Sequence, residues 1–262
     1  KRAYQNFFKC SAYGSRYHAF IGCLFIMLKK LFNKAHYTYD NEARLQKTVG
    51  DQLFEIIQHK SSQYQNIIDI GCGTGYVTKR FAERLQYQSF HALDIADNLL
   101  NLAKTRLKNF PIQFLEKDFR LFQSKLSFDL IYSNMALHWS ENMTDVIANL
   151  LTSLKKNGLL AFSIPLAGTF KEISSYVNTI DFIDQEKILN EWQVSFYETQ
   201  KIVLEFPSML QALQSIKKIG ANYTGKNRKG LHNNPFLKKI LLNPSHDSTT
   251  LTYHIGYFFL ES

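Results

Sequence analysis

The sequence predicts a doubly wound α/β fold, a mostly parallel sheet with helices on both faces. The run NIIDIGCGTGY, residues 66–76, passes from a β-branched apolar stretch into a glycine-rich turn. This pattern is typical of a buried parallel strand that leads into a helix. Strand-like and helix-like segments then alternate as far as Pro165. Such alternation predicts parallel strands that are joined by right-handed crossovers.

A helix is expected over Asp40–His59, because its apolar residues recur at helical spacing. The first five strands are then expected at Ile67–Gly71, Ser89–Leu93, Ile112–Leu115, Phe128–Ser133 and Leu159–Ile164. The helices between them are expected at Val77–Leu85, Asn98–Leu107 and Met143–Leu154. The pair Asn157-Gly158 is a turn signal before the fifth strand.

The alternation weakens after Pro165. Helices are expected at Thr169–Phe182, Gln185–Trp192 and Ser208–Ile219, a polar loop at Asn222–Lys229, and strands at Val194–Phe206 and Leu251–Leu260. The two late strands would complete a seven-stranded sheet. The helices of an insertion at about 166–219 would form a helical cover over the active site.

Length and charge narrow the class of protein. The 262 residues suffice for one large α/β domain with a full core, and the 45% hydrophobic content is typical of a folded chain. The formal charge of +9 favours anionic partners. No long arginine-rich run or RNA-binding signature occurs, so nucleic acid is not an expected partner.

The amino end carries an apolar run, Ala19–Leu28, that is too short to span a bilayer, and no membrane partner is expected. We expect residues 1–31 to be an N-terminal extension, with the functional protein starting at Met27 and the domain covering 32–262. The spacing of Cys10, Cys23 and Cys72 fits neither a zinc site nor a disulfide framework. The sequence therefore predicts no metal site and a cytoplasmic location.

Acidic residues accompany the glycine turn: Asp69 leads it, Asp94 ends the second strand and Asp118 follows the third. The dinucleotide pattern G-x-G-x-x-G does not fit, since the third glycine comes one residue early at Gly75. The pattern D-x-G-x-G-x-G, with acids after the next two strands, resembles that of class I S-adenosylmethionine-dependent methyltransferases. The resemblance implies their Rossmann-like fold and S-adenosyl-L-methionine as the cofactor.

The same resemblance implies a set of cofactor contacts. Gly71, Gly73 and Gly75 would approach the methionine moiety, and Asp69 would orient the loop or meet the amino group. Asp94 would accept the ribose hydroxyls, and Asp118 and Phe119 would meet the adenine. Ser133 and Asn134 would lie beside the methyl group. Asp118 also fits a turn or helix-cap carboxylate, and that alternative stays open.

More specific segments are SNMALHW at 133–139, IKKIGA at 216–221 and LTYH at 251–254. With residues 32–46, they resemble the malonyl-[acyl carrier protein] O-methyltransferases of biotin synthesis, and the resemblance covers nearly everything from residue 32 onward. It implies methyl transfer to the free carboxylate of a malonyl thioester, carried by acyl carrier protein or by coenzyme A. A carboxylate is already ionised at neutral pH, so no general base is needed.

Candidate residues follow for the methyl acceptor. Tyr39 would close over the methyl group and Asn134 would lie beside it, as catalytic residues, while His138 and Trp139 would line the pocket wall. Arg228 would bind the substrate carboxylate through its planar fork. Lys217 and Lys218 would pair with an acidic carrier protein. Each has an ordinary structural alternative: core packing for the aromatic and histidine side chains, a solvated surface for the basic ones.

Other functions remain open from the residues alone. Another small-molecule class I methyltransferase, acting on a carboxylic acid or a quinone-type ring, would share every cofactor feature. A nucleic-acid methyltransferase is permitted by the charge. A non-catalytic module that binds S-adenosylmethionine would keep the same fold. The sequence does not indicate an oligomeric state.

Overall fold

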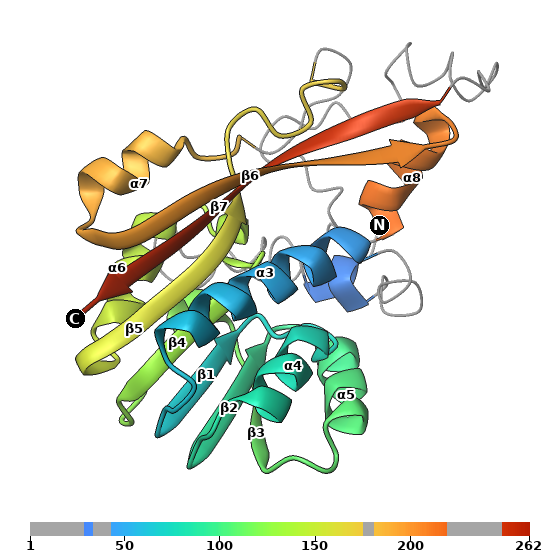
Figure 1. The fold of residues 1–262 in the computed structure, drawn as a ribbon. Helices are drawn as coiled ribbons and strands as arrows, with labels where there is room; N and C mark the ends of the chain where they lie inside the picture. The colour runs from blue at the N-terminus through green and yellow to red at the C-terminus, as the bar shows by residue number, and fades with distance from the viewer. Residues whose placement is uncertain (1–28, 34–42, 175–180, 219–247) are drawn as a thin grey trace, which may run out of the picture.

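The computed structural model of the protein describes residues 29–33, 43–174, 181–218 and 248–262 (Figure 1). Its strands are β1 (Asn66–Ile70), β2 (Ser89–Asp94), β3 (Ile112–Glu116), β4 (Phe128–Asn134), β5 (Leu154–Pro165), β6 (Val194–Phe206) and β7 (Thr249–Glu261). Its helices are α3 (Arg44–Lys60), α4 (Tyr76–Arg84), α5 (Asp97–Arg106), α6 (Met143–Leu151), α7 (Gln185–Glu191) and α8 (Met209–Lys218). Residues 29–33 are also helical, and two 3-10 helices, η1 (Phe119–Leu121) and η2 (Leu137–Trp139), follow β3 and β4.

The seven strands form one sheet in the order β3-β2-β1-β4-β5-β7-β6. The first five strands pair in parallel, whereas β7 runs antiparallel between β5 and β6. The chain moves outward from β1 to β3 and then returns to the other side of β1 with β4. The carboxyl ends of β1 and β4 therefore form a topological switch point, where open α/β sheets bind ligands. The predicted fold class is confirmed.

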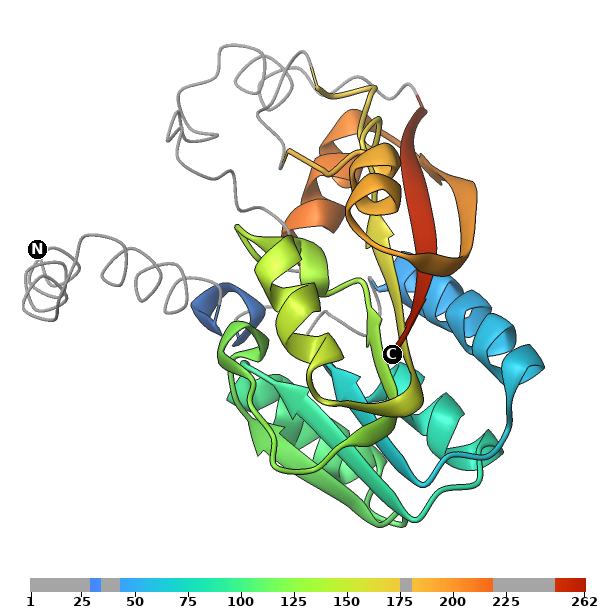
Figure 2. The same cartoon turned by 90° about the vertical axis from the view of Figure 1, so that its left-hand side faces the viewer.

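Helices cover both faces of the sheet (Figures 1 and 2). Side chains of α3, α4 and α8 share one core cluster with the sheet, and side chains of α6 and α7 share another with its opposite face. In the first cluster the Phe81 ring stacks on Tyr132 at a centroid distance of 3.9 Å and meets Phe54 edge-on at 5.1 Å. Along the central strands, successive apolar residues alternate between the two clusters, as Ile67 and Ile68 do in β1.

The predicted helix at Thr169–Phe182 is wrong for residues 169–174, which form turns. Gly168 and Phe170 have φ angles of 90° and 63°, outside the helical region. The backbone N–H of Phe170 donates to Thr252 O of β7, and the Thr169 hydroxyl accepts the N–H of His254. The segment thus follows the neighbouring strand, so tertiary hydrogen bonds replace those of a helix. Residues 181 and 182 at the end of the predicted helix are not helical either, and residues 175–180 lie outside the described ranges.

The turn signal at Asn157-Gly158 lies inside β5, because that strand begins at Leu154. Asn157 has a φ of 63°, and the pairing of β4 with β5 shifts register between Phe128 and Leu130. A Cβ at Gly158 would lie 2.9 Å from Phe128 O. The signal therefore marks an irregularity of the strand. Helix α6 correspondingly ends at Leu151, three residues before the predicted Leu154.

The remaining boundaries agree with expectation to within a few residues. Helix α3 begins at Arg44, and residues 40–42 of its predicted range lie outside the described part of the chain, as do residues 1–26 and 219–229. Among the helices that the structure describes, none combines the length and apolar character that crossing a bilayer requires.

Replacing Phe81 by alanine should lower the free energy of unfolding by about 3–5 kcal/mol, because a fully buried ring would leave a cavity between α3, α4 and the sheet. Tyr197→Ala is the matched control, since that ring is 52% exposed on β6 and should cost under about 1 kcal/mol. Urea unfolding of both variants measures the difference. Equal losses would contradict the assignment of Phe81 to the core.

Candidate active site

A pocket opens where the switch point lies, at the carboxyl ends of the parallel strands. Seven of the predicted cofactor and substrate residues line it: Gly71, Gly73, Asp94, Asp118, Phe119, Asn134 and Trp139. Phe32, Met135 and Arg120, to which the sequence analysis assigned no role, also line it. The pocket therefore gathers side chains and backbone from segments that are far apart in the chain.

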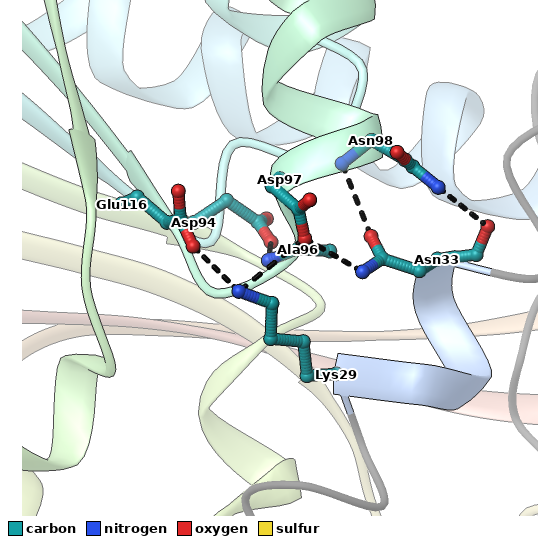
Figure 3. Close-up of polar contacts among 7 residues, drawn as sticks. All are labelled: Lys29, Asn33, Asp94, Ala96, Asp97, Asn98 and Glu116. Atoms are coloured by element: carbon teal, nitrogen blue, oxygen red, sulfur yellow. Dashed lines mark hydrogen bonds and ion pairs between the residues drawn. The ribbon is translucent and has the colours of Figure 1, made fainter.

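Asp94, the last residue of β2, is 7% exposed and its carboxylate holds two backbone groups. Oδ2 accepts the N–H of Gly73 at 2.8 Å. Oδ1 accepts the N–H of Ala96 at 2.8 Å, a contact that Figure 3 shows. Burial raises the pKa of Asp94, while the N–H groups of Ala96 and Gly73 oppose this by stabilising the ionised form. One carboxylate thus connects the glycine turn to the start of α5.

Asp69 belongs to β1, is 2% exposed and does not line the pocket. Its Oδ2 accepts the hydroxyl groups of Thr78 and Tyr132, each at 2.7 Å. Burial raises the pKa of Asp69 to about 7. The hydroxyl groups of Thr78 and Tyr132 act in the opposite direction, and the nearby charge of Asp94 raises the pKa slightly further. Of the two roles expected for Asp69, this geometry fits orientation of the loop, since the carboxylate ties β1 to α4 and β4.

The three turn glycines, Gly71, Gly73 and Gly75, all have φ between 55° and 79°. Gly71 and Gly73 line the pocket. Gly75 instead packs against α5, where an added Cβ would lie 2.8 Å from Leu107 Cδ1 and 3.0 Å from Ala103 Cβ. Its missing side chain lets α4 and α5 approach each other, which is a packing role rather than a contact with a ligand.

Asp118 caps η1 by accepting the N–H of Arg120 at 2.9 Å. The Arg120 guanidinium also grips both carboxylate oxygens of Asp118, with Nη2 2.6 Å from Oδ2. The capping alternative is therefore realised, and it brings Phe119 and Arg120 to the pocket wall. A basic residue two positions after an acid is common, so the sequence alone gave no reason to select Arg120.

Ser133 and Asn134 end β4. The Ser133 hydroxyl is fully buried and donates to Ile70 O, so it joins β4 to β1. The Asn134 side chain is used at both ends: Nδ2 donates to Gln46 O of α3 at 2.9 Å, and Oδ1 accepts the Ser163 hydroxyl at 2.8 Å. Asn134 therefore holds α3 against the ends of β4 and β5.

The pair that follows, His138 and Trp139, lies in η2. The two rings are 5.0 Å apart, and His138 also packs near Phe182. Burial lowers the pKa of His138 to about 3, so the imidazole is neutral at pH 7. Its Nδ1 has no hydrogen-bond partner within the described residues. Trp139 lines the pocket, whereas His138 lies behind it.

Two predicted acceptor residues, Tyr39 and Arg228, lie outside the described residues, as do the side chains of Lys217 and Lys218. Met135 adds an unpredicted feature: its φ of 53° is rare for a side chain of this kind, and it lines the pocket beside Asn134. Within the described ranges, no three His, Cys, Asp or Glu side chains gather as a metal site would require.

Comparison with solved structures shows the fold of methyltransferases. A protein from Bacillus halodurans that is named as a candidate methyltransferase superposes with a TM-score of 0.60, at 11% identity, over 80% of this chain and 98% of its own. The phosphoethanolamine N-methyltransferase 2 of Haemonchus contortus, solved with S-adenosyl-L-methionine, gives 0.54 at 16% identity, over 81% of this chain and 52% of its own. The methyltransferase-domain family model matches residues 67–158. The fold is therefore that of the class I, Rossmann-like methyltransferases.

Sequence relatives narrow the class to a family. The malonyl-[acyl-carrier protein] O-methyltransferase 2 of Coxiella burnetii is 36% identical over 243 residues, which cover 89% of this chain and 95% of the relative. The malonyl-[acyl-carrier protein] O-methyltransferase 1 of Ilyobacter polytropus is 28% identical over 88% of this chain and 92% of its own length. The chain belongs to the malonyl-[acyl-carrier protein] O-methyltransferase family.

Asp69→Asn should change how stability depends on pH. The folded carboxyl, with a pKa of about 7, keeps a proton at pH values where the unfolded chain has lost it, so wild-type stability falls as pH rises through the folded pKa. Asparagine cannot ionise. We expect wild-type stability relative to the variant to fall by roughly 1–3 kcal/mol between about pH 5 and 8, measured by urea unfolding.

The control is Asp51→Asn, because the Asp51 side chain is 44% exposed on α3. This variant should keep the wild-type pH profile. A wild-type profile for Asp69→Asn as well would show that the buried carboxyl does not titrate in this range.

Proposed function

We propose that the protein transfers a methyl group from S-adenosyl-L-methionine to the free carboxylate of malonyl-acyl carrier protein, or of malonyl-coenzyme A. The proposal rests on one combined observation. A chain of this family carries a pocket at its switch point, lined by Gly71, Gly73 and a buried Asp94. The cofactor would supply an electrophilic methyl on a sulfonium, and the remaining chemistry would depend on how the protein orients the acceptor.

The pocket residues fit this cofactor. The Asp94 carboxylate accepts backbone N–H groups, those of Gly73 and Ala96 among them, and its remaining lone pairs would accept the two ribose hydroxyls. Phe119 and Asp118 border the same space and would meet the adenine. Gly71 and Gly73 leave room for the methionine moiety to approach the backbone, and we assign Gly75 to packing.

The acceptor needs no general base, since its carboxylate is already ionised. Two described side chains near the end of β4 are poor candidates for a base. Asn134 is held by Gln46 O and Ser163, and burial lowers the pKa of His138 to about 3, which makes its imidazole a weak base. We therefore assign Asn134 a positioning role, in place of direct catalysis. Rate enhancement would come from alignment of oxygen, methyl and sulfur, and from exclusion of water by aromatic walls such as Trp139.

The acceptor residues themselves remain proposals. Tyr39 would close over the reacting groups, and Arg228 would hold the malonyl carboxylate. The excess of basic residues, 31 against 22 acidic, would favour encounter with an acidic carrier protein, and Lys217 and Lys218 are candidates for that contact. We propose the cytoplasm as the location, which suits the free and buried thiol of Cys72.

The direct test is incubation with S-adenosyl-L-methionine and malonyl-acyl carrier protein, followed by intact-mass measurement of the carrier. We expect a gain of ~14 Da for a methyl ester, which moves with a methyl label in the cofactor. Acetyl-acyl carrier protein, which lacks the free carboxylate, is the matched control and should gain nothing. A protein that binds the cofactor but leaves the malonyl group unmodified would contradict the acceptor.

Asp94→Asn should weaken cofactor affinity by about tenfold to a hundredfold, because an amide cannot accept two hydroxyls and two N–H groups at once. Isothermal titration measures the change. Asp129→Asn is the matched control: Asp129 also accepts two backbone N–H groups, from Gln65 and Asn66, but at the amino end of β4. Both variants should lose some stability, and only Asp94→Asn should lose affinity. Equal affinities would remove Asp94 from the ribose site.

A further inference from the structure

The short helix at residues 29–33 lies against the start of α5, beside the pocket (Figure 3). We infer that Asn33 and Lys29 are positioning residues of the cofactor pocket: by fixing this helix to α5, they hold Phe32 in the pocket wall. The inference rests on the proposed function, since it assigns these residues to cofactor retention. It also includes residues 29–31 in the working domain, which the sequence analysis began at residue 32.

Asn33 caps the amino end of α5, which its own N-cap residue leaves without a side-chain cap. The N-cap residue of α5 is Ala96, which has no side-chain cap, so the first N–H groups of the helix need partners from elsewhere. Asn33 Oδ1 accepts the N–H of Asn98 at 3.1 Å. In return Asn33 Nδ2 donates to Asp97 Oδ1 at 2.7 Å, and Asn98 Nδ2 donates to Asn33 O at 3.3 Å. These hydrogen bonds join Asn33 to Asp97 and Asn98, which lie 64 and 65 positions later in the chain.

Lys29 adds charge to the same contact. Its ammonium lies 2.5 Å from Glu116 Oε1 at the end of β3 and 3.3 Å from Asp97 Oδ1 (Figure 3). The hydrogen bond to Glu116, opposed by slight desolvation and aided by Asp97, raises the pKa of Lys29. The acidic side chains are about half exposed, so the pairs should contribute little alone and less at high salt. Asn33 is therefore expected to matter more than Lys29.

Phe32 carries the effect into the pocket. Its ring meets Trp139 edge-on at a centroid distance of 5.3 Å, and both rings line the pocket. Trp139 is fixed in η2, whereas Phe32 depends on the helix at 29–33 for its position. Loss of the Asn33 contacts should free this wall and let water reach the cofactor site. Asn33 also bonds to Asp97 and Asn98, which directly follow Ala96, and the N–H of Ala96 donates to Asp94 Oδ1.

The test measures binding of S-adenosylhomocysteine and S-adenosyl-L-methionine, by titration and by stopped-flow dissociation, for wild type, Asn33→Ala, Lys29→Ala and Lys29→Arg. Asn33→Ala should weaken affinity about fivefold to twentyfold, chiefly through faster dissociation, and should change kcat at saturating cofactor less than about twofold. Lys29→Ala should weaken it about twofold to fivefold at about 50 mM salt and not at about 500 mM. Lys29→Arg should restore wild-type binding.

Lys60→Ala is the matched control, because it removes a surface ion pair with Glu261 that is remote from the pocket residues. It should leave affinity and dissociation unchanged. Wild-type affinity and dissociation in Asn33→Ala would overturn the inference, as would equal effects of Lys29→Ala at both salt concentrations. If Asn33→Ala does not fold, the salt dependence of Lys29→Ala decides alone. A wild-type protein that binds neither compound would instead overturn the proposed function, and this inference with it.

Discussion

The carboxylate of Asp94 joins the two segments that surround the switch point. One of its oxygens fixes Gly73 of the glycine turn, and the other fixes Ala96 at the start of α5. The turn is also held to the same strand by Leu93 O, which accepts the N–H groups of Gly71 and Cys72. A ligand that contacts Asp94 therefore meets a site whose parts are already aligned, which lowers the entropy that binding must overcome. The pocket wall depends on this alignment, because α5 in turn anchors the residues that carry Phe32.

Much of the fold could be predicted because the central strands obey local rules. β1, β2 and β4 are short, apolar and bounded by turn residues, and their order follows from the alternation with helices. The failures occur where distant backbone groups replace local ones. Phe170 donates to Thr252 O and leaves the helical region, and Asn157 enters β5 by adopting a left-handed conformation. The N–H of Asn157 donates to Ser262 O, so both partners lie far away in the sequence and local propensity could not reveal the outcome.

The candidate site likewise has residues that the sequence predicts and roles that it does not. Asp94, Asp118 and the turn glycines are found from their positions at the ends of predicted strands, since parallel strands bring those ends to one edge. Their individual roles become clear only from the contacts that each residue makes in the folded chain. Gly75 faces α5 in place of the pocket, and the amide of Asn134 is occupied by Gln46 and Ser163. Phe32 belongs to the family-like segment 32–46 but carried no assigned role, and Arg120 had no distinguishing pattern, because a basic residue next to a motif usually has no special function.

The missing cap of α5 bears on how the chain folds. Ala96 supplies no side-chain cap, and the N–H of Asn98 in the first turn is accepted by Asn33, 65 residues away. An isolated peptide of α5 would therefore fray at its amino end, and that first turn can become stable only after the loop between residues 33 and 98 has closed. Contacts between residues far apart in the sequence form late in folding. We therefore expect the part of the pocket wall at Phe32, which residues 29–33 carry, to become ordered last during refolding.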